Sequence, residues 1–336
     1  MKAKPRAQAD RSPSSGTKAP GSNRPALALH GIIAPLVTPL RERDRLDAAG
    51  LERLIEHVLS GGVHGLFVLG TTGEGPSLSY RLRRELISRT CRQVANRVPV
   101  LVGITDTAFV ESVRLAQHAA EAGAQALVTS APYYFPSGQP ELLEYLEQLV
   151  PELPLPLFLY NMPMMTKTRF EVDTLRQVLH LKGVIGVKDS SGDLAYFSQV
   201  VKLARARPDW TVFMGPEHLL VEAMKRGGHG GVNGGAQVSP RLFADLYKAA
   251  KRGDSSSIVR LQRRLLQLGQ IYQVGRHASA VIKGIKCALS LLGVCNDFMA
   301  EPFSPFRAPE RERVRAILDS LRLLESGSSQ TPERTT

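Results

Sequence analysis

Short apolar runs recur along this chain at intervals of roughly 20 to 35 residues, and a helical pattern follows each run. Each interval accommodates one strand, one helix and two connecting loops. Strands that alternate with helices form a parallel sheet that is buried on both faces. The runs cover residues 31–37, 65–69, 98–103, 126–129, 155–160, 184–188, 211–214 and 230–232. Eight such units predict an α/β fold, a closed (β/α)8 TIM barrel, with an open doubly wound sheet as the alternative.

The first helical segment illustrates the pattern. Asp47 is placed to cap its N-terminus, and Gly61-Gly62 is placed to end it. The apolar residues between them follow the spacing of one helix face: Leu51, Leu54, Ile55, Val58 and Leu59. We therefore expect this helix to bury one face.

Beyond the eighth unit the pattern is helical only. One barrel helix is expected over residues 242–251, and further helices over residues 257–272, 280–292 and 310–324. We predict four parts: a disordered basic tail (1–26), the barrel (27–250), a C-terminal helical extension (251–324) and a flexible tail (325–336).

The net charge of +12 comes partly from the N-terminal tail. Six basic residues and one acidic residue lie within the first 25 positions, in a segment rich in Pro, Ser and Gly. Elsewhere both signs alternate on predicted helices, as is typical of a solvated surface. No recognition motif accompanies the charge, so we predict no nucleic-acid partner.

The chain has no run that approaches the ~20 apolar residues of a membrane-spanning helix, and no secretory leader. Its cysteines, Cys91, Cys287 and Cys295, are widely separated, which fits reduced thiols better than a disulfide framework. We therefore expect a cytoplasmic protein without a membrane partner.

The sixth run ends in Lys188, at the edge where barrels carry their catalytic groups. By the alternation of a strand, Lys188 shares one face with Val184 and Gly186, while Ile185 faces the helices. Inside a barrel, desolvation lowers the pKa of a lysine and leaves a nucleophilic amine. The alternative is a lysine that pairs with Asp189 or extends to solvent at the rim.

The preceding run ends in Tyr160, which shares a face with Phe158. On the adjacent strand, its phenol would lie beside the Lys188 amine. A phenol in that place can transfer protons during carbinolamine formation and C–C bond cleavage. The alternative is an aromatic side chain that only fills the top of the barrel.

Two loops carry further candidates. Gly70-Thr71-Thr72-Gly73-Glu74-Gly75 follows the second run and suits a small carboxylate or phosphate, with a purely structural turn as the alternative. It lacks the lysine of a Walker loop and the spacing of a dinucleotide fingerprint. Pro132-Tyr133-Tyr134-Phe135-Pro136 follows the fourth run and is typical of packing or of an interface. The histidines and cysteines show no metal-ligand spacing, so we predict no metal site.

Three motifs in this order resemble the dihydrodipicolinate synthase and N-acetylneuraminate lyase family. They are Gly70-Thr71-Thr72-Gly73-Glu74, Tyr160-Asn161-Met162-Pro163 and Gly186-Val187-Lys188-Asp189-Ser190-Ser191-Gly192. The resemblance extends from about residue 31 to residue 324 and includes the helical extension. It implies a Schiff-base-forming class I lyase or aldolase.

The resemblance implies that Lys188 forms the imine with pyruvate or a related 2-oxo acid. Tyr160 would relay protons, and Thr71 would complete the relay. The backbone N–H groups of Thr71 and Thr72 would hold the carboxylate, and Tyr134 would reach the neighbouring subunit's site across a tight dimer interface. The resemblance also implies a homotetramer built as a dimer of dimers, without metal or organic cofactor.

One position departs from the synthase branch, which has an arginine two residues beyond the proline to bind the aldehyde's carboxylate. Met165 stands there, and a thioether cannot replace a guanidinium. We therefore favour cleavage, condensation or dehydration of a 2-oxo-3-deoxy or 4-hydroxy-2-oxo acid, with an aldehyde or sugar-acid co-substrate. The candidates for contacts with that substrate are Met165, Lys167, Glu217 and Asn233. For Glu217 and Asn233, a purely structural role is the alternative.

Two other functions stay open at this point, besides a nucleic-acid binder driven by the basic tail, whose binding would depend steeply on salt. One is 4-hydroxy-tetrahydrodipicolinate synthase, which Met165 disfavours. The other, from a different class, is a non-catalytic homologue that binds an oxo acid. The presence of Lys188, Tyr160 and Thr71 together argues against it, because a silent homologue is free to lose them.

Overall fold

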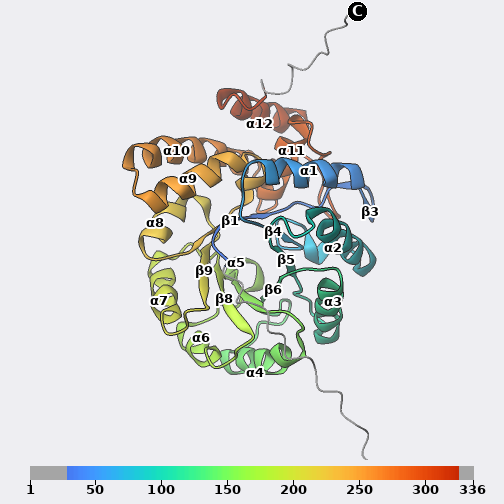
Figure 1. Ribbon diagram of the computed structural model, residues 1–336. Helices are drawn as coiled ribbons and strands as arrows, with labels where there is room; N and C mark the ends of the chain where they lie inside the picture. The colour runs from blue at the N-terminus through green and yellow to red at the C-terminus, as the bar shows by residue number, and fades with distance from the viewer. Residues whose placement is uncertain (1–28, 325–336) are drawn as a thin grey trace, which may run out of the picture.

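The computed structural model describes residues 29–324 and forms a closed parallel barrel (Figure 1). Its strands are β1 (Gly31–Pro35), β4 (Gly65–Val68), β5 (Val100–Gly103), β6 (Ala126–Ser130), β7 (Leu157–Asn161), β8 (Val184–Asp189), β9 (Thr211–Met214) and β10 (Gly230–Val232). Strand β1 pairs with both β10 and β4, which closes the ring. The predicted (β/α)8 barrel is therefore confirmed, and the open sheet is excluded.

Helices surround the barrel, and each barrel strand leads to at least one of them. They are α1 (Ala48–Ser60), α2 (Tyr80–Val94), α3 (Phe109–Glu121), α4 (Gln139–Leu149), α5 (Pro163–Thr166), α6 (Val172–Val178), α7 (Leu194–Ala204), α8 (Leu220–Lys225), α9 (Pro240–Arg252), α10 (Ser255–Leu268), α11 (Ala280–Leu291) and α12 (Ala308–Ser320). The first of them has the predicted ends. The Asp47 carboxylate accepts the Gly50 N–H, and Gly61 is the C-cap.

A small antiparallel hairpin, β2 (Leu40–Glu42) and β3 (Arg45–Leu46), precedes α1. The sequence pattern did not indicate it. Its strands of three and two residues are too short and too charged to show apolar alternation. Asp44 turns the hairpin with φ of 51°, a conformation that Asp adopts more readily than most residues.

Two separate apolar clusters divide the core. The inner cluster fills the barrel, and its main members are Ile33, Phe67, Leu101, Val128, Phe158, Tyr160, Phe213 and Val232. The outer cluster lies between the strands and the helices. The strands alternate between the two clusters, which is why they read as continuous apolar runs in the sequence.

Strand β8 departs from simple alternation. The pairing with β7 shifts register between Leu157 and Phe158, and Gly186 takes φ of 156° at this irregularity. A Cβ on Gly186 would lie 2.1 Å from the Thr211 carbonyl oxygen, so only glycine fits. Val184 consequently belongs to the outer cluster, and Ile185 packs against the inner one. The prediction that Val184 shares the face of Lys188 and that Ile185 faces the helices was wrong, because the extra residue reverses the alternation.

The C-terminal helices α10, α11 and α12 gather on one side of the barrel, beside α9 and α1 (Figure 1). Leu261, Leu265 and Leu268 of α10 join the same outer cluster as the barrel helices. The division into a barrel (27–250) and an extension (251–324) stays a prediction. The predicted tails, 1–26 and 325–336, lie outside the described residues.

Within residues 29–324, no helix is long and apolar enough to cross a membrane. Cys91, Cys287 and Cys295 are buried and unpaired. Burial raises the pKa of each thiol, to about 11 for Cys91 and Cys287 and about 12 for Cys295.

Two half-buried histidines complete the hydrogen bonding at the starts of barrel strands. Nδ1 of His64 accepts the Ile32 N–H at 3.1 Å, and Nδ1 of His229 accepts the Val212 N–H at 3.0 Å. An acceptor Nδ1 requires a neutral ring. Burial lowers the pKa of both imidazoles, with nearby His30, Lys248 and Lys251 adding to the effect on His64.

We expect acid to destabilise the fold through these rings. The folded-state pKa is lowered, so the unfolded chain binds the proton first as the pH falls below about 6.5. The contribution of the two histidines to the free energy of unfolding is thus fully present above that pH and declines below it. His229→Asn keeps an acceptor oxygen without a titrating ring, and its melting temperature should fall less between pH 7 and pH 5 than that of the parent. Equal slopes in the two proteins would contradict the assignment.

Candidate active site

Lys188 and Tyr160 face each other on neighbouring strands. Their Cα positions are paired in the β7–β8 register, and both side chains are buried, with 6 % and 7 % exposure. The Lys188 Nζ lies 3.7 Å from the centroid of the Tyr160 ring. The sequence-based expectation that the two lie side by side inside the barrel is therefore met, and the alternative of a lysine at the solvent rim does not describe this geometry.

The environment of Lys188 favours its neutral form. Burial lowers the pKa of the ammonium, and Tyr160 opposes this effect only in part. The uncharged amine has the lone pair that a nucleophile needs. The site therefore provides a lysine that is poised to attack an electrophilic carbon nearer to neutral pH than a solvated lysine.

Tyr160 is linked to Thr71 across the barrel mouth. The two hydroxyl groups lie 3.3 Å apart, a loose hydrogen bond in which either group can donate. Burial by itself raises the pKa of the Tyr160 phenol. When Lys188 carries its proton, its charge and the hydrogen bonds with Thr71, Ser190 and Lys188 outweigh burial, so the pKa is lowered. A phenol of this kind can both give and take a proton.

Phe67 forms the floor of the site and was not anticipated from the sequence. Its ring centroid lies 5.1 Å from the Lys188 Nζ, and its side chain is 1 % exposed. An aromatic ring beneath the amine excludes water from it. The alternation of side chains along residues 65–68 indicates that Phe67 points into the barrel, so its position could have been predicted.

The loop over residues 69–75 is tightly constrained. Leu69 and Glu74 have positive φ angles of 61° and 57°. Thr38 Oγ1 donates to the Gly73 carbonyl oxygen at 2.7 Å, and the Glu74 N–H donates to the Thr71 carbonyl oxygen at 3.1 Å. Thr71 and Thr72 themselves are partly exposed. Their backbone is thus held in place while their polar groups remain accessible.

Tyr134 lies outside this buried cluster. Its side chain is 85 % exposed, its φ is 83°, and its ring packs edge to face against Phe135 at 5.2 Å. A non-glycine residue with positive φ and an exposed ring is an unusual and costly arrangement. The role predicted for Tyr134 in a neighbouring subunit stays a prediction.

Met165 and Lys167 lie on and just after α5, at the end of β7. Met165 is 43 % exposed. Lys167 takes φ of 61° as the C-cap, and its Nζ donates to the Met164 carbonyl oxygen at 3.0 Å. The ammonium therefore folds back on its own helix in this structure.

Glu217 and Asn233 lie at the ends of β9 and β10, and both are buried. Glu217 Oε1 accepts the Gly235 N–H and, at 2.8 Å, the Tyr272 hydroxyl. Asn233 Nδ2 donates to the Gly215 carbonyl oxygen at 2.9 Å. Each side chain thus has protein partners on one atom, while Glu217 Oε2 and Asn233 Oδ1 are buried without a hydrogen-bond partner among the residues that the structure describes. Contact with a substrate stays a prediction for both.

A hydrogen-bonded layer supports the ends of β7 and β8 behind the site. Asn161 Nδ2 donates to Asp189 Oδ1 at 2.9 Å, and the Ser191 N–H and hydroxyl donate to the same carboxylate at 3.0 and 3.1 Å. Burial raises the pKa of Asp189, and these hydrogen bonds oppose it. Because Asn161 and Asp189 directly follow Tyr160 and Lys188, the layer fixes the side chains of Tyr160 and Lys188 relative to each other.

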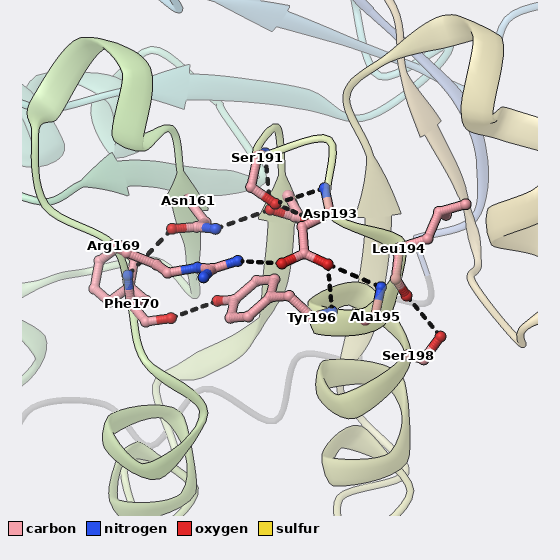
Figure 2. Close-up of polar contacts among 10 residues, drawn as sticks. Asn161, Arg169, Phe170, Ser191, Asp193, Leu194, Ala195, Tyr196 and Ser198 are labelled. Atoms are coloured by element: carbon pink, nitrogen blue, oxygen red, sulfur yellow. Dashed lines mark hydrogen bonds and ion pairs between the residues drawn. The ribbon is translucent and has the colours of Figure 1, made fainter.

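The same layer fastens the chain that follows α5 to helix α7 (Figure 2). Asn161 Oδ1 accepts the Phe170 N–H at 3.1 Å, and the Tyr196 hydroxyl donates to the Phe170 carbonyl oxygen at 2.6 Å. Arg169 donates to Asp193 at 2.8 Å and stacks over the Tyr196 ring at 4.4 Å. Asp193 also caps α7 by accepting the N–H groups of Ala195 and Tyr196. The segment with Met165 is thus anchored at its far end.

No group of three or more His, Cys, Asp or Glu side chains within residues 29–324 is arranged to hold a metal ion.

Glu217 should make the free energy of unfolding fall as the pH rises, whereas His64 and His229 make it fall as the pH decreases. Burial raises its pKa from 4.5 to about 7, so the folded protein retains the proton longer than the unfolded chain. Stability from this group is complete below about pH 4.5 and is lost as the pH rises through about 7. Glu217→Gln keeps an acceptor for Tyr272 and Gly235, and we expect it to stabilise the fold at pH 8 by up to about 3 kcal/mol.

Chemical denaturation of Glu217→Gln and of the parent at pH 5 and pH 8 measures this effect. The difference between the proteins should be small at pH 5 and large at pH 8. A similar loss of stability at both pH values would show that the carboxylate itself is required.

The model of the dihydrodipicolinate synthetase family matches residues 28–321 of this chain. A 4-hydroxy-tetrahydrodipicolinate synthase from Ralstonia nicotianae is 33 % identical over 296 residues, which cover 88 % of this chain and 99 % of that protein. The solved structure of dihydrodipicolinate synthase from Bacteroides thetaiotaomicron is 53 % identical and covers 87 % of this chain and 99 % of its own, with a TM-score of 0.84.

YagE from Escherichia coli K12, a putative 2-dehydro-3-deoxy-D-gluconate aldolase, is 30 % identical over 296 residues, which cover 87 % of this chain and 97 % of that protein. Its crystal structure in complex with pyruvate has a TM-score of 0.84 and covers 88 % of this chain and 100 % of its own. The family model and the relatives cover both the barrel and the C-terminal helices. This chain therefore belongs to the dihydrodipicolinate synthetase family.

Proposed function

We propose that the protein is a Schiff-base-forming lyase that acts on pyruvate or a related 2-oxo acid through Lys188. The observation that carries the proposal is the buried Lys188 amine, 3.7 Å from the Tyr160 ring centroid, with its pKa lowered by burial. Membership of the family supports the same chemistry, and the relative YagE was crystallised in complex with pyruvate.

In the proposed reaction, the neutral Lys188 amine adds to the C2 carbonyl carbon of the 2-oxo acid. Transfer of a proton from nitrogen to oxygen gives a carbinolamine. Protonation of its hydroxyl group and loss of water leave a protonated imine. Tyr160 is placed to move these protons, and the Thr71 hydroxyl at 3.3 Å offers it an exchange partner.

The protonated imine is the electron sink for the bond change that follows. In a cleavage, the C3–C4 bond pair moves toward the imine to form an enamine, while the C4 hydroxyl loses its proton and becomes the aldehyde carbonyl. Condensation is the reverse. In a dehydration, a base instead removes a proton from C3 of the intact imine, and the enamine that results expels the C4 hydroxyl group, which takes up a proton and leaves as water. The proposed chemistry uses no metal or organic cofactor, because the imine itself accepts the electrons.

The loop with Thr71 and Thr72 is proposed to hold the carboxylate of the 2-oxo acid through its backbone N–H groups. The constrained backbone and the partial exposure of both residues support this role. An oriented carboxylate fixes the position of the ketone next to it. Its C2 carbon is then presented to the amine of Lys188.

The second substrate is proposed to be an aldehyde or a sugar acid that is recognised near Met165 through its hydroxyl groups rather than through a carboxylate. Met165 supports this choice, because its thioether cannot form the paired hydrogen bonds that an arginine gives to a carboxylate. Glu217, Asn233 and Lys167 remain the candidates for contacts with its hydroxyl groups, although each has a protein partner when no substrate is bound.

A second candidate is 4-hydroxy-tetrahydrodipicolinate synthase, the name of several relatives, including one 33 % identical. Identity at this level supports it, and Met165 argues against it. The non-catalytic alternative is disfavoured, because Lys188, Tyr160 and Thr71 are not only present but lie together in the barrel.

The proposed assembly is a homotetramer in the cytoplasm, in which Tyr134 completes the site of a neighbouring subunit. The 85 % exposure of Tyr134 on a loop beside the barrel mouth supports a contact outside its own chain.

Reduction with borohydride in the presence of pyruvate tests the central claim. The imine on Lys188 should be trapped as a stable secondary amine, visible as one added pyruvate by intact mass and located by peptide mapping. Lys188→Ala should give no adduct. Folded protein that yields no adduct with pyruvate or with larger 2-oxo acids would refute the proposal and revive the non-catalytic alternative.

A substrate screen separates the two enzymatic candidates. We expect cleavage of 2-oxo-3-deoxy sugar acids with release of pyruvate, and turnover of pyruvate with aspartate semialdehyde that is slower by at least about tenfold, the loss expected without a paired arginine–carboxylate contact. Efficient use of aspartate semialdehyde, detected by consumption of pyruvate, would favour the synthase instead.

A further inference from the structure

A buried ion pair joins the loop with Thr71 and Thr72 to the C-terminal helices. Glu74 lies in the loop, Lys286 lies on α11, and Glu74 Oε2 contacts Lys286 Nζ. The two side chains are 2 % and 0 % exposed. No other ion pair within residues 29–324 is enclosed as completely.

Both charged groups also bind the segment that connects α11 to α12. Lys286 Nζ donates to the Phe298 carbonyl oxygen at 2.7 Å, and the Ala300 N–H donates to Glu74 Oε1 at 2.8 Å. The ion pair thus joins the loop that contains Glu74 to α11 and to the segment that follows α11. If one partner of the pair is removed, the charge of the other stays buried without a counter-ion, because neither side chain is exposed to solvent.

The ion pair holds the side chain of Glu74, and the backbone of Glu74 is hydrogen-bonded to that of Thr71. Glu74 has the left-handed conformation, with φ of 57° and ψ of 25°, and it begins the short helix η1 (Gly75–Ser77). Its N–H donates to the Thr71 carbonyl oxygen, and the Gly75 N–H donates to the Gly70 carbonyl oxygen at 3.3 Å. A non-glycine residue keeps this conformation only where its surroundings impose it. Movement of the Glu74 side chain would therefore shift the peptide groups of Thr71 and Thr72.

We infer that Glu74 and Lys286 are positioning residues for the 2-oxo acid, and that the C-terminal extension is thereby part of the substrate site. The inference rests on the proposed function, in which the Thr71–Thr72 loop holds the carboxylate. Neither residue touches the substrate. Their contribution is to the affinity for the carboxylate rather than to the chemistry at Lys188.

The single variant Lys286→Met leaves the Glu74 carboxylate buried without a counter-ion. The double variant Glu74→Gln/Lys286→Met removes both charges at similar volume, and the introduced glutamine retains an acceptor for the Ala300 N–H. Replacing both partners of a buried pair restores stability that replacing one destroys. The double variant therefore separates the positioning role from a loss of folding.

Leu318→Ala is the matched control. Leu318 lies on α12, is fully buried and belongs to the outer apolar cluster. Its truncation loosens the extension while the ion pair and its hydrogen-bond partners keep their residues.

The measurement is borohydride trapping of the full chain at graded pyruvate concentrations, with the melting temperature of each protein. Lys286→Met should raise the pyruvate concentration for half-maximal trapping at least about tenfold, with trapping still complete at saturation. The double variant should melt close to the parent and still need at least about threefold more pyruvate. Leu318→Ala should melt lower and trap like the parent.

A double variant that traps pyruvate at the parent's concentrations would overturn the inference, whether or not the single variant folds. An equal shift in Leu318→Ala would do the same, since it would show general loosening. Absence of any adduct in the parent protein would instead refute the proposed function, so the two failures are distinguishable.

Discussion

One amine, that of Lys188, is enclosed in an apolar barrel, and the groups around it are arranged by that enclosure. Lys188 ends a strand that points its side chain over Phe67 and against Tyr160, where water is scarce. Desolvation penalises the ammonium and shifts the lysine toward the form that can attack a carbonyl. The fold supplies this environment by closing eight parallel strands, so that no open edge admits solvent beside the amine.

Two supports hold the groups around that amine, one on each side of the barrel mouth. On the side of β7 and β8, the Asn161 and Asp189 side chains lock the strand ends that carry Tyr160 and Lys188. On the side of β4, Glu74 holds the loop with Thr71 through Lys286 and Ala300. Both supports contain buried carboxylates, which are costly unless every oxygen has a donor or counter-ion. Such groups stabilise one geometry rather than the fold in general, and a site for imine chemistry needs one geometry.

Sequence patterns predicted the strands and the first helix closely, since apolar periodicity and capping residues act locally. They predicted that Tyr160 lies beside Lys188, because the two residues end adjacent parallel strands. The link between Thr71 and Tyr160 was expected only from the resemblance to the family. The patterns were wrong about Val184 and Ile185, because the irregularity at Gly186 is a property of the pairing between two strands.

Sequence patterns did not indicate the role of Phe67 or the hairpin of β2 and β3. Glu217 and Asn233 were expected to contact substrate, and the structure adds protein partners that spacing alone could not reveal.

Local sequence patterns specify the order of strands and helices, the closed barrel, the residue types at the strand ends and the family. Each of these depends on periodicity, on local caps or on motifs that are contiguous in the chain. The folded arrangement is needed to establish which way β8 turns its side chains, that Lys188 is buried, and that Glu74 contacts Lys286 and Ala300. These features depend on contacts between segments far apart in the sequence, where packing and desolvation, rather than local propensity, determine the arrangement.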